Sequence, residues 1–528
     1  MLLIGTAEKP DSFSYDPWGA ARLVNWGAGE NSDAECGSTS SRVAKVNNGA
    51  AHDDMSLELS SQQLRELVDQ AMQRLSLFLD TLPEQPTSNL DGAEQIARSV
   101  SEPLPESGVL AEEVLDQLFD TLIPASLNPT SPGYMAYVPG GGLPQAAVAD
   151  LISGITNRFV GIWHVAPAVA QIEATVIRWF CAMVGYPGGA GGFLTSGGSL
   201  ANWSAIVTAR RCRLPDNFLN GVLYTSDQAH HSVTKAAILA GFPTQNVRSI
   251  SVDASFRIRI DALANQIARD RHDGLQPFCL IAHAGTVNTG AVDELAALAE
   301  LAEQHHLWLH VDAAYGGFFL LTERGRERLQ GIERADSITI DPHKGLFLPY
   351  GTGGLLVRDR NDLRHAHCMR GDYIPPAPDD PDFVDFSDIS PELSRGFRGL
   401  RIWLPFKLHG ASPFRSNLNE KLDLASWATS ELRQMNEEIN DELEIVAEPQ
   451  LSMLAFRLVR PGLGEDELNR LNGQLLERIN STGRVMLSAT RLHNRYVIRV
   501  CILSFRTHRP EVATCLHEIR QAISSLSG

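Results

Sequence analysis

A lysine follows a predicted buried strand in the second half of the chain. The apolar run at 337–340 (SITI) predicts a short strand, and Asp341-Pro342-His343-Lys344 comes directly after it. Lysine side chains usually extend into water, so a lysine at the end of a buried strand is partly removed from water and can act as a nucleophilic amine. The alternative is a loop lysine whose amine reaches the solvent. On this segment alone both interpretations stay open.

A carboxylate ends a second predicted strand. The run at 307–311 (LWLHV) is followed by Asp312, in the segment HVDAAY. A carboxylate in this position can hold a protonated pyridine nitrogen, and the small side chain of Ala314 leaves room for a flat ring. Alternatively, Asp312 caps a helix that follows the strand.

Two further junctions between strand and helix carry glycine or polar residues. The turn Thr195-Ser196-Gly197-Gly198-Ser199 opens a predicted helix, and the free N–H groups at a helix start suit a phosphate. The segment Ser226-Asp227-Gln228-Ala229-His230 follows another predicted strand and presents an imidazole. Each signal is weak alone, because glycine-rich turns are common and a lone histidine is more often a helix cap or a core residue.

Together, the four junctions predict a site for pyridoxal phosphate. This cofactor requires a phosphate cradle, a group that stacks on its ring, a carboxylate at its pyridine nitrogen and a lysine amine at its aldehyde. All four parts occur at the ends of successive predicted strands, which argues for a single site.

The segments SDQAH, HVDAAY and DPHK resemble, in order and spacing, those of the group II pyridoxal phosphate-dependent decarboxylases. That family includes aromatic-L-amino-acid, histidine, glutamate and 2,4-diaminobutyrate decarboxylases, and the resemblance covers roughly residues 60–525. It implies the α/β fold type I of pyridoxal phosphate-dependent transferases, which is aspartate aminotransferase-like. This fold has a large domain with a mostly parallel sheet and a small α+β C-terminal domain. The resemblance also implies a homodimer with its active sites at the subunit interface.

The resemblance assigns cofactor-binding roles to particular residues. Lys344 would carry pyridoxal phosphate covalently, Asp312 would pair with its pyridine nitrogen, and His230 would stack on the ring and take part in catalysis. The further residues expected to contact the cofactor are Gly198, Ser199, Ser337 and His343 at the phosphate, and Ala314 and Thr286 at the ring.

Other residues are expected, from the same resemblance, to serve the reaction. Tyr373 matches the catalytic-loop tyrosine of the family and would protonate the α-carbon after CO2 leaves. Arg499 matches an arginine near the substrate carboxylate, and Tyr137 lies in the substrate-access segment. Arg395 lies in a familiar segment, but no role is assigned to it. The surrounding stretch 371–393 is rich in proline and aspartate and predicts a mobile loop over the site, with a plain solvated acidic loop as the alternative.

The predicted reaction is decarboxylation of an L-amino acid to the amine and CO2, with an aromatic amino acid as the first choice. Gly345 stands where animal members usually have tryptophan, Asp341 stands where several relatives have asparagine, and the access segment contains Gly140–Gly142. The small Gly140–Gly142 segment and the acidic stretch 371–393 suggest 2,4-diaminobutyrate or another short basic amino acid as the alternative substrate. The alternative functions are an aldehyde synthase, against which the retained Tyr373 argues, and a catalytically silent cofactor-binding protein.

Alternating helices and strands are expected to position these residues. Helices are predicted at 148–162, 169–186, 198–211, 230–241 and 293–306, and strands at 221–225, 278–285, 307–311, 337–340 and 353–359. This alternation is typical of a mostly parallel sheet covered on both faces, which binds ligands beyond the carboxyl ends of its strands. Two later strands, at 453–459 and 496–505, predict a smaller α+β unit.

The changes of pattern along the chain predict its domain organisation. Residues 1–54 have little apolar periodicity and are interpreted as a disordered tail or as the result of a misplaced start, with Met55 as the true start. Residues 55–130, with helices at 60–82 and 109–123, would form an N-terminal helical dimerisation segment. The large cofactor-binding domain would cover 131–400 and the small domain 401–528.

Composition and charge exclude several classes of protein. The chain has 45 Lys and Arg against 63 Asp and Glu, a net charge of −18, which disfavours nucleic acid and anionic membranes as partners. No apolar run is long enough to span a membrane. The seven cysteines form no CxxC pair, and neither His365-Ala366-His367-Cys368 nor His305-His306 has the spacing of a metal site. We therefore expect a cytoplasmic enzyme without a metal.

Overall fold

The computed structural model describes residues 57–375, 380, 382–439 and 442–526. It divides into two compact units, Met1–Leu64 and Arg65–Gly528, and each is described by itself. The interpretations of residues 1–54 lie outside the described residues. In the first unit, α1 (Ser61–Asp80) begins where the sequence predicts a helix. Ser60 caps it, because its Oγ accepts a hydrogen bond from the backbone N–H of Gln63 at 3.3 Å.

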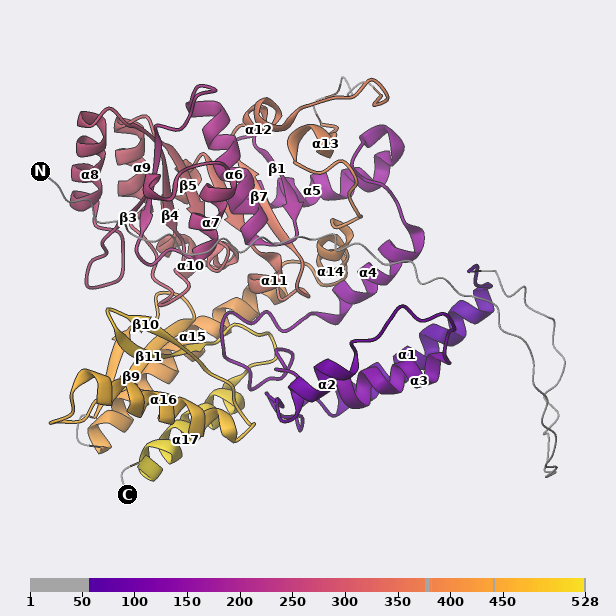
Figure 1. Ribbon diagram of the computed structural model, residues 1–528, viewed down its shortest axis with the longest axis vertical. Helices are drawn as coiled ribbons and strands as arrows, with labels where there is room; N and C mark the ends of the chain where they lie inside the picture. The colour runs from indigo at the N-terminus through magenta and orange to yellow at the C-terminus, as the bar shows by residue number, and fades with distance from the viewer. Residues whose placement is uncertain (1–56, 376–379, 381, 440–441, 527–528) are drawn as a thin grey trace, which may run out of the picture. The chain divides into compact units, whose positions relative to one another are not determined.

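A seven-stranded sheet lies within the second unit (Figure 1). The order of its strands is β1-β7-β6-β5-β4-β2-β3. Strands β3, β2, β4, β5 and β6 run parallel, and β7 runs antiparallel to its neighbours β6 and β1. The mostly parallel sheet predicted from the sequence is thereby confirmed. The strands are β1 (Gly191–Thr195), β2 (Gly221–Ser226), β3 (Val247–Ile250), β4 (Gln276–His283), β5 (Trp308–Asp312), β6 (Ser337–Ile340) and β7 (Gly353–Val357).

Two strands of this sheet, β1 and β3, were missed by the sequence analysis. Strand β1 has the sequence GGFLT, and glycine weakens the strand signal because it has no side chain to pack. Strand β3 has the sequence VRSI and lies at an edge of the sheet, where alternating polar residues interrupt the apolar run. The other five strands have longer apolar runs and were predicted close to their observed positions.

Both faces of the sheet are buried, which explains the nearly continuous apolar sequence of its strands. Along β4, Leu280 and Ala282 belong to one hydrophobic cluster, whereas Cys279 and Ile281 belong to another. The first cluster includes residues of α8 (Ile260–His272) and α9 (Leu295–Gln304). The second includes residues of α6 (Gly198–Arg213) and α7 (His231–Leu239). These helices therefore cover opposite faces of the sheet.

Further helices of the second unit connect the strands or precede the sheet. The predicted helix at 148–162 is shorter than expected, because Asn157 adopts a left-handed conformation with φ 44° and ends it. The predicted helix at 109–123 continues as a π-helical segment over Gln117–Leu122. The helices are α2 (Ala93–Ser99), α3 (Ala111–Asp116), α4 (Pro144–Thr156), α5 (Pro167–Val184), α10 (Glu323–Arg328), α11 (Pro342–Gly345), α12 (Arg360–His367), α13 (Phe386–Ile389) and α14 (Leu400–His409).

An antiparallel sheet near the C-terminus has the order β10-β11-β9-β8. Its strands are β8 (Leu443–Ala447), β9 (Met453–Leu458), β10 (Ser488–Leu492) and β11 (Arg495–Cys501). It packs with α15 (Ser412–Glu438), α16 (Glu465–Ser481) and α17 (Arg509–Leu526), the orange-to-yellow part of Figure 1. A separate hydrophobic cluster joins Leu432, Leu475 and Ile519 of these helices to Phe456 and Ile498 of the sheet. The predicted small α+β region is confirmed, although β8 and β10 were missed.

Candidate active site

A cavity of about 460 Å³ lies at the carboxyl ends of the parallel strands. Parallel strands end at the same edge of a sheet, so residues that are distant in sequence meet there. Nine predicted residues line the cavity: Tyr137, Gly198, Ser199, His230, Thr286, Asp312, Ala314, His343 and Lys344. Three predicted residues, Ser337, Tyr373 and Arg499, are not part of its lining.

The amine of Lys344 lies beside a buried carboxylate. Its Nζ is 3.1 Å from Oδ2 of Asp341, and the same oxygen is 3.6 Å from Nε2 of His343. The Nδ1 of His343 lies 2.6 Å from the carbonyl oxygen of Thr352, and it must donate this hydrogen bond because a carbonyl only accepts. Burial lowers the pKa of His343, although the charge of Asp341 acts in the opposite direction. His343 is therefore a neutral residue at the wall near pH 7.

Asp312 is a buried, ionised carboxylate at the end of β5. Its Oδ2 accepts a hydrogen bond from Nδ2 of Asn202 at 2.9 Å, and its Oδ1 accepts one from the backbone N–H of Ala314 at 3.1 Å. Burial alone would raise the pKa of Asp312. The influence of His283, the Asn202 hydrogen bond and the charge of Lys344 outweigh burial and lower this pKa below its ordinary value. The site thus holds a negative charge where a protonated pyridine nitrogen could pair with it.

Asn202 and His283 support Asp312 and were not predicted. His283 ends β4 in register with Asp312 of β5, and its Nδ1 lies 3.3 Å from Oδ2 of Asp293. Its place at the end of the predicted strand 278–285 was a signal that could have indicated it. Asn202 comes from α6 and lies 110 positions away from Asp312 in the chain, so no local pattern could have indicated that contact.

The glycine-rich turn between β1 and α6 is held in place by Thr195. Its Oγ1 donates a hydrogen bond to the carbonyl of Gly197 at 3.0 Å and accepts one from the Gly197 N–H at 3.3 Å. A Cβ added at Gly198 would lie 3.0 Å from Oδ2 of Asp341 and 3.3 Å from Cβ of Ala314, so any larger residue would require these neighbours to move by a few tenths of an ångström. The first turn of α6 carries no acidic residue, and its first N–H groups have no partner within the helix. The turn is therefore suited to bind a phosphate.

His230 combines the two roles that the sequence left open. It is the N-cap of α7, because its Nδ1 accepts a hydrogen bond from the Ser232 N–H at 3.2 Å, and it also lines the cavity. Burial lowers the pKa of His230, although Asp312 acts in the opposite direction. The ring is therefore neutral near pH 7, and its proton resides on Nε2.

Two further predicted residues form walls of the cavity. The buried Oγ1 of Thr286 lies 2.9 Å from Oγ1 of Thr289 and accepts a hydrogen bond from the Ala291 N–H at 3.1 Å. Tyr137 is exposed and has a φ of 54°, a left-handed conformation that is costly for a tyrosine. Its backbone N–H donates to Oγ of Ser488 at 3.1 Å, which ties this strained residue to β10.

The prediction that Ser337 binds phosphate is wrong. Ser337 is the first residue of β6, whereas Lys344 follows the last residue of this strand. The serine therefore lies at the amino end of the strand, away from the carboxyl end where the cavity is. Its buried Oγ accepts a hydrogen bond from Nε1 of Trp308 at 2.8 Å and lies 2.8 Å from Nδ1 of His310. Nε2 of His310 in turn lies 3.1 Å from Oδ1 of Asn202. Ser337 thus belongs to a buried network behind the cavity.

Arg499 is also not placed as the resemblance implies. Its buried guanidinium donates to the carbonyl oxygens of Asn288 at 3.0 Å and Val287 at 2.5 Å, and to Oγ of Ser488 at 3.1 Å. These bonds direct its donors to backbone and side-chain atoms of β10 and of the segment after Thr286. Arg499 holds two wall segments together and is not part of the cavity lining.

Tyr373 lies outside the cavity of its own chain. Its side chain is 77% exposed, near the start of the segment 371–393, of which the structure describes 371–375, 380 and 382–393. Arg370 precedes this segment, and its Nη2 lies 2.6 Å from both Oδ2 of Asp385 and Oδ2 of Asp388. These ion pairs connect the start of the segment to α13, and Tyr373 lies between them in the sequence with an exposed side chain.

The residues around the cavity fit pyridoxal phosphate. Lys344 supplies a primary amine and Asp312 a buried negative charge. The Gly197–Ser199 turn supplies a helix start, and the absence of a side chain at Gly198 leaves space there for a ligand. When bound, this cofactor supplies an electron sink for a carbanion formed next to its ring. In the described part of the chain, no cluster of three His, Cys, Asp or Glu side chains could hold a metal ion, and no helix is long and apolar enough to cross a membrane.

Comparison with known families agrees with this chemistry. The pyridoxal-dependent decarboxylase conserved domain matches residues 94–459, more than half of the chain. The chain belongs to the pyridoxal-dependent decarboxylase family. This decarboxylase is therefore a pyridoxal phosphate-dependent carboxy-lyase, as the resemblance of its motifs predicted.

Individual relatives of the decarboxylase cover nearly its whole length. The aromatic-L-amino-acid decarboxylase of Bacillus atrophaeus is 35% identical over 473 residues, which are 89% of this chain and 98% of the relative. The phenylacetaldehyde synthase of Arabidopsis thaliana is 28% identical over 485 residues, 89% of this chain and 97% of the relative. The crystal structure of Oryza sativa TDC with PLP and tryptamine matches with a TM-score of 0.84 and 25% identity, over 90% of this chain and all of that chain. The predicted fold type I is thus confirmed.

Proposed function

We propose that this decarboxylase converts an aromatic L-amino acid to the corresponding amine and CO2. The composition of the cavity wall is the observation that carries this proposal. Away from the cofactor-binding groups, the wall includes Tyr137, Val138, Leu200, Val287 and Tyr350, which together offer an apolar and aromatic surface to a flat side chain. The identity shared with the Bacillus atrophaeus aromatic-L-amino-acid decarboxylase supports the same substrate class.

The same wall argues against a basic substrate such as 2,4-diaminobutyrate. The carboxylates among the described lining residues are Asp312 and Asp341. Asp312 binds Asn202 and the backbone at Ala314, and Asp341 lies against Lys344 and the glycine-rich turn, with its Oδ1 unpaired. Both carboxylates thus lie among the proposed cofactor-binding groups, and a second ammonium group placed against the apolar wall would be unpaired, which is costly in a partly buried cavity.

Each cavity residue has a distinct task in the proposed mechanism. Lys344 would hold the cofactor through its Nζ. Asp312 would favour a protonated pyridine nitrogen, because its own lowered pKa keeps it ionised. His230 would contact the ring as a neutral imidazole, and the Gly197–Ser199 turn would bind the phosphate. The bound cofactor would supply an electron sink for the loss of the substrate carboxylate.

We assign the protonation of the α-carbon to Tyr373 of a second copy of the chain. The phenol is 77% exposed and lies outside the cavity of its own chain, which supports a role in a neighbouring subunit. Exposed apolar side chains on α1 and α4 support a homodimer, since such surfaces favour association. These side chains are Leu67, Met72, Leu75, Leu79, Val148, Leu151, Ile152 and Ile155. A phenol at the α-carbon would act as a general acid.

Aldehyde synthesis is a second candidate function, because the phenylacetaldehyde synthase of Arabidopsis thaliana matches nearly the full chain. In that reaction, oxygen would oxidise the carbon that otherwise receives a proton. The retained Tyr373 favours the amine, since a positioned acid protonates that carbon before oxygen reaches it.

The test is a screen of CO2 release over the common L-amino acids and 2,4-diaminobutyrate, with analysis of the products. We expect CO2 and amine in equal amounts from tryptophan, tyrosine, phenylalanine or dihydroxyphenylalanine. Release from 2,4-diaminobutyrate alone would contradict the proposed substrate class. Aldehyde with ammonia and hydrogen peroxide would instead identify an aldehyde synthase.

We also propose that the protein works in the reducing cytoplasm. The described cysteines Cys181, Cys212, Cys279, Cys368, Cys501 and Cys515 are free thiols. Burial raises the pKa of Cys181, Cys501 and Cys515 to about 12, so these thiols stay protonated and unreactive. Fractionation of cells that produce the protein should recover it, with its activity, in the cytoplasmic fraction, and recovery from a secreted fraction would contradict this.

A further inference from the structure

A completely buried ion pair lies next to the glycine-rich turn. Nη2 of Arg395 lies 2.7 Å from Oε1 of Glu173, and both side chains are 0% exposed. Glu173 belongs to α5, and Arg395 follows the segment 371–393, so the pair joins parts of the chain that are 222 positions apart. Buried ion pairs contribute little net stability compared with apolar packing, so this pair calls for another explanation.

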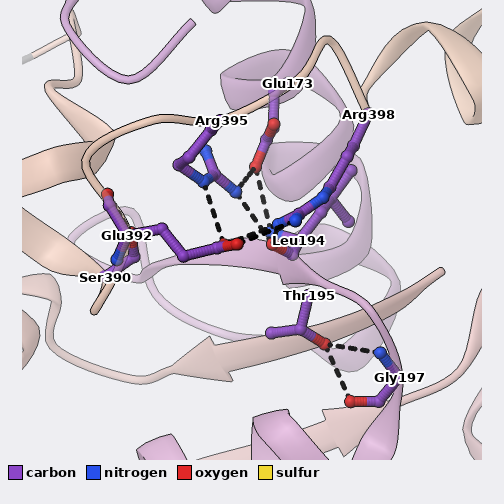
Figure 2. Close-up of polar contacts among 8 residues, drawn as sticks. All are labelled: Glu173, Leu194, Thr195, Gly197, Ser390, Glu392, Arg395 and Arg398. Carbon is purple, nitrogen blue, oxygen red and sulfur yellow. Dashed lines mark hydrogen bonds and ion pairs between the residues drawn. The ribbon is translucent and has the colours of Figure 1, made fainter. Parts of the chain in front are cut away.

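The pair converges on one residue of an edge strand, Leu194 of β1 (Figure 2). The Leu194 N–H donates to Oε1 of Glu173 at 3.0 Å. The Leu194 carbonyl accepts from Nη2 of Arg395 at 2.8 Å and from Nη1 of Arg398 at 3.2 Å. An edge strand has no neighbour on one side, and here side chains satisfy the backbone groups that a further strand would otherwise bind. Glu173 and Arg395 therefore fix the position of the last part of β1.

The glycine-rich turn begins at the next residue. Thr195 follows Leu194 and makes both of its side-chain hydrogen bonds to Gly197, as Figure 2 shows. The backbone of Gly197 also packs closely on β7, since a Cβ added at Gly353 would lie 2.5 Å from Gly197 Cα. Because of these hydrogen bonds and this close packing, a shift of Leu194 would also move the backbone of Gly197 and Gly198.

On its other side, the pair contacts the segment that follows Tyr373. Oε2 of Glu392 lies 3.4 Å from Nε of Arg395 and 2.6 Å from Nη1 of Arg398. The Arg395 guanidinium lies 4.6 Å from the centre of the Phe386 ring, in α13. Arg395 thus lies between the segment that carries the proposed acid and the strand that presents the turn.

We propose that Arg395 and Glu173 are a positioning pair that holds the Gly197–Ser199 turn in the geometry required to bind the cofactor phosphate. This inference rests on the proposed role of that turn as the phosphate site. The planar guanidinium reaches Glu173, Leu194 and Glu392 at the same time, which a single ammonium group cannot do. Arg395 thereby acts through the turn and touches neither substrate nor cofactor.

Two forms of the cofactor test this proposal, pyridoxal phosphate and pyridoxal, which lacks the phosphate. Both dissociation constants are measured by titrating the stripped enzyme and following the absorbance of the bound ring. The dissociation constant of pyridoxal divided by that of pyridoxal phosphate is the ratio that reports on the phosphate site alone. We expect Arg395→Lys to lower this ratio about tenfold, the scale of one hydrogen bond to a charged group, by weakening pyridoxal phosphate binding and leaving pyridoxal binding unchanged.

The matched control is Arg248→Lys. Arg248 also forms a forked ion pair, with the buried Asp270, but in β3 at the far edge of the sheet. This substitution should lower the thermal unfolding temperature and leave the ratio unchanged. A ratio that Arg395→Lys leaves at the wild-type value, with a fall in unfolding temperature like that of Arg248→Lys, would show a merely structural role and overturn the proposal.

Two milder substitutions keep the test decisive if Arg395→Lys does not fold. Glu173→Gln keeps an acceptor for the Leu194 N–H, and Arg398 is 24% exposed, so Arg398→Lys is easily accommodated. Both should lower the ratio, by about tenfold and about threefold, and an unchanged ratio in both overturns the proposal.

Gly198→Ala tests the turn itself. A wild-type ratio near one, unaffected by Gly198→Ala, would overturn the phosphate site and with it the pair. A high wild-type ratio that survives Glu173→Gln would overturn only the pair.

Discussion

The amine of Lys344 lies 3.1 Å from the buried Oδ2 of Asp341. The same carboxylate borders the glycine-rich turn, since its Oδ2 would lie 3.0 Å from a Cβ added at Gly198. The Asp341 carboxylate therefore lies between the lysine amine and the start of α6. The amine and the turn would hold the aldehyde and the phosphate arm of the cofactor, which are on neighbouring ring carbons, and this proximity explains why a short motif after β6 can determine the location of the site.

Lys344 is expected to carry the cofactor. Borohydride reduction of the holoenzyme followed by peptide mapping should place the pyridoxyl group on Lys344. Lys344→Ala should bind pyridoxal phosphate without a reducible bond and lose activity, whereas Lys407→Ala, on α14, should retain both properties. Labelling of Lys235 or Lys407 in the wild-type enzyme would contradict the assignment.

Tyr373→Phe should lower amine formation about 10²–10⁴-fold, the usual effect of removing a positioned general acid. The substitution removes only a hydroxyl from an exposed side chain, so folding and cofactor absorbance should be unchanged. Product analysis should detect some aldehyde, because oxygen can then oxidise the unprotonated carbon. Wild-type amine formation without aldehyde would mean that the proton comes from elsewhere, with His230 as the next candidate.

Mixing two inactive variants tests whether Tyr373 acts in the partner subunit. A dimer of one Tyr373→Phe chain and one Lys344→Ala chain would have one site with both Lys344 and a partner tyrosine. We therefore expect the mixed, reassembled enzyme to regain up to about a quarter of wild-type activity, since half of the dimers are mixed and each has one complete site. No recovery, although mass spectrometry shows mixed dimers, would place the acting tyrosine in the same chain as its lysine.

Ser337→Ala should reduce stability and spare cofactor binding. The substitution leaves the buried Nε1–H of Trp308 without its acceptor, which costs about 1–3 kcal/mol of unfolding free energy in urea titrations. The dissociation constant for pyridoxal phosphate should stay within about twofold. Ser199→Ala, at the turn, is the matched control and should show the reverse pattern. Weaker cofactor binding in Ser337→Ala at unchanged stability would restore the phosphate role that the geometry contradicts.

Acid should destabilise the protein through His310. Burial lowers the pKa of His310 to about 4, whereas an unfolded histidine has a pKa of about 6.5. Between these values the unfolded chain binds a proton that the folded protein does not, so stability falls as the pH falls from about 6.5 to about 4. At pH 5 this residue alone should remove about 2 kcal/mol relative to pH 7.5.

The pH effect can be measured by urea unfolding at pH 7.5 and pH 5. His310→Gln should reduce the difference between the two values by about 2 kcal/mol. His367 should leave a further part of the dependence, since burial lowers its pKa to about 4 as well. Equal stability of the wild-type protein at both pH values would contradict a neutral, buried His310.

Several features of the site were predictable from the sequence because they depend on local order along the chain. A strand in a buried sheet presents the residues after its carboxyl end to the ligand site, and this rule located Asp312, His230 and Lys344, whereas Gly198 was predicted from a glycine-rich turn at a helix start. Ser337 was assigned to the phosphate by the resemblance and not by this rule, and it begins its strand. The mostly parallel sheet followed from long apolar runs, whereas the short or glycine-containing strands β1 and β3 lacked such a signal.

Contacts between distant segments were decided only by the tertiary structure. Asn202 donates a hydrogen bond to Asp312 from a helix, and Arg499 donates one to the backbone of the cavity wall at Val287. Arg395 binds Glu173, which lies 222 positions away in the chain. The sequence shows which residues could ionise or donate, but partners and distances arise when helices and strands pack. For the same reason Tyr373 was identified from its spacing, while its exposure and its distance from the cavity of its own chain became evident only in the folded molecule.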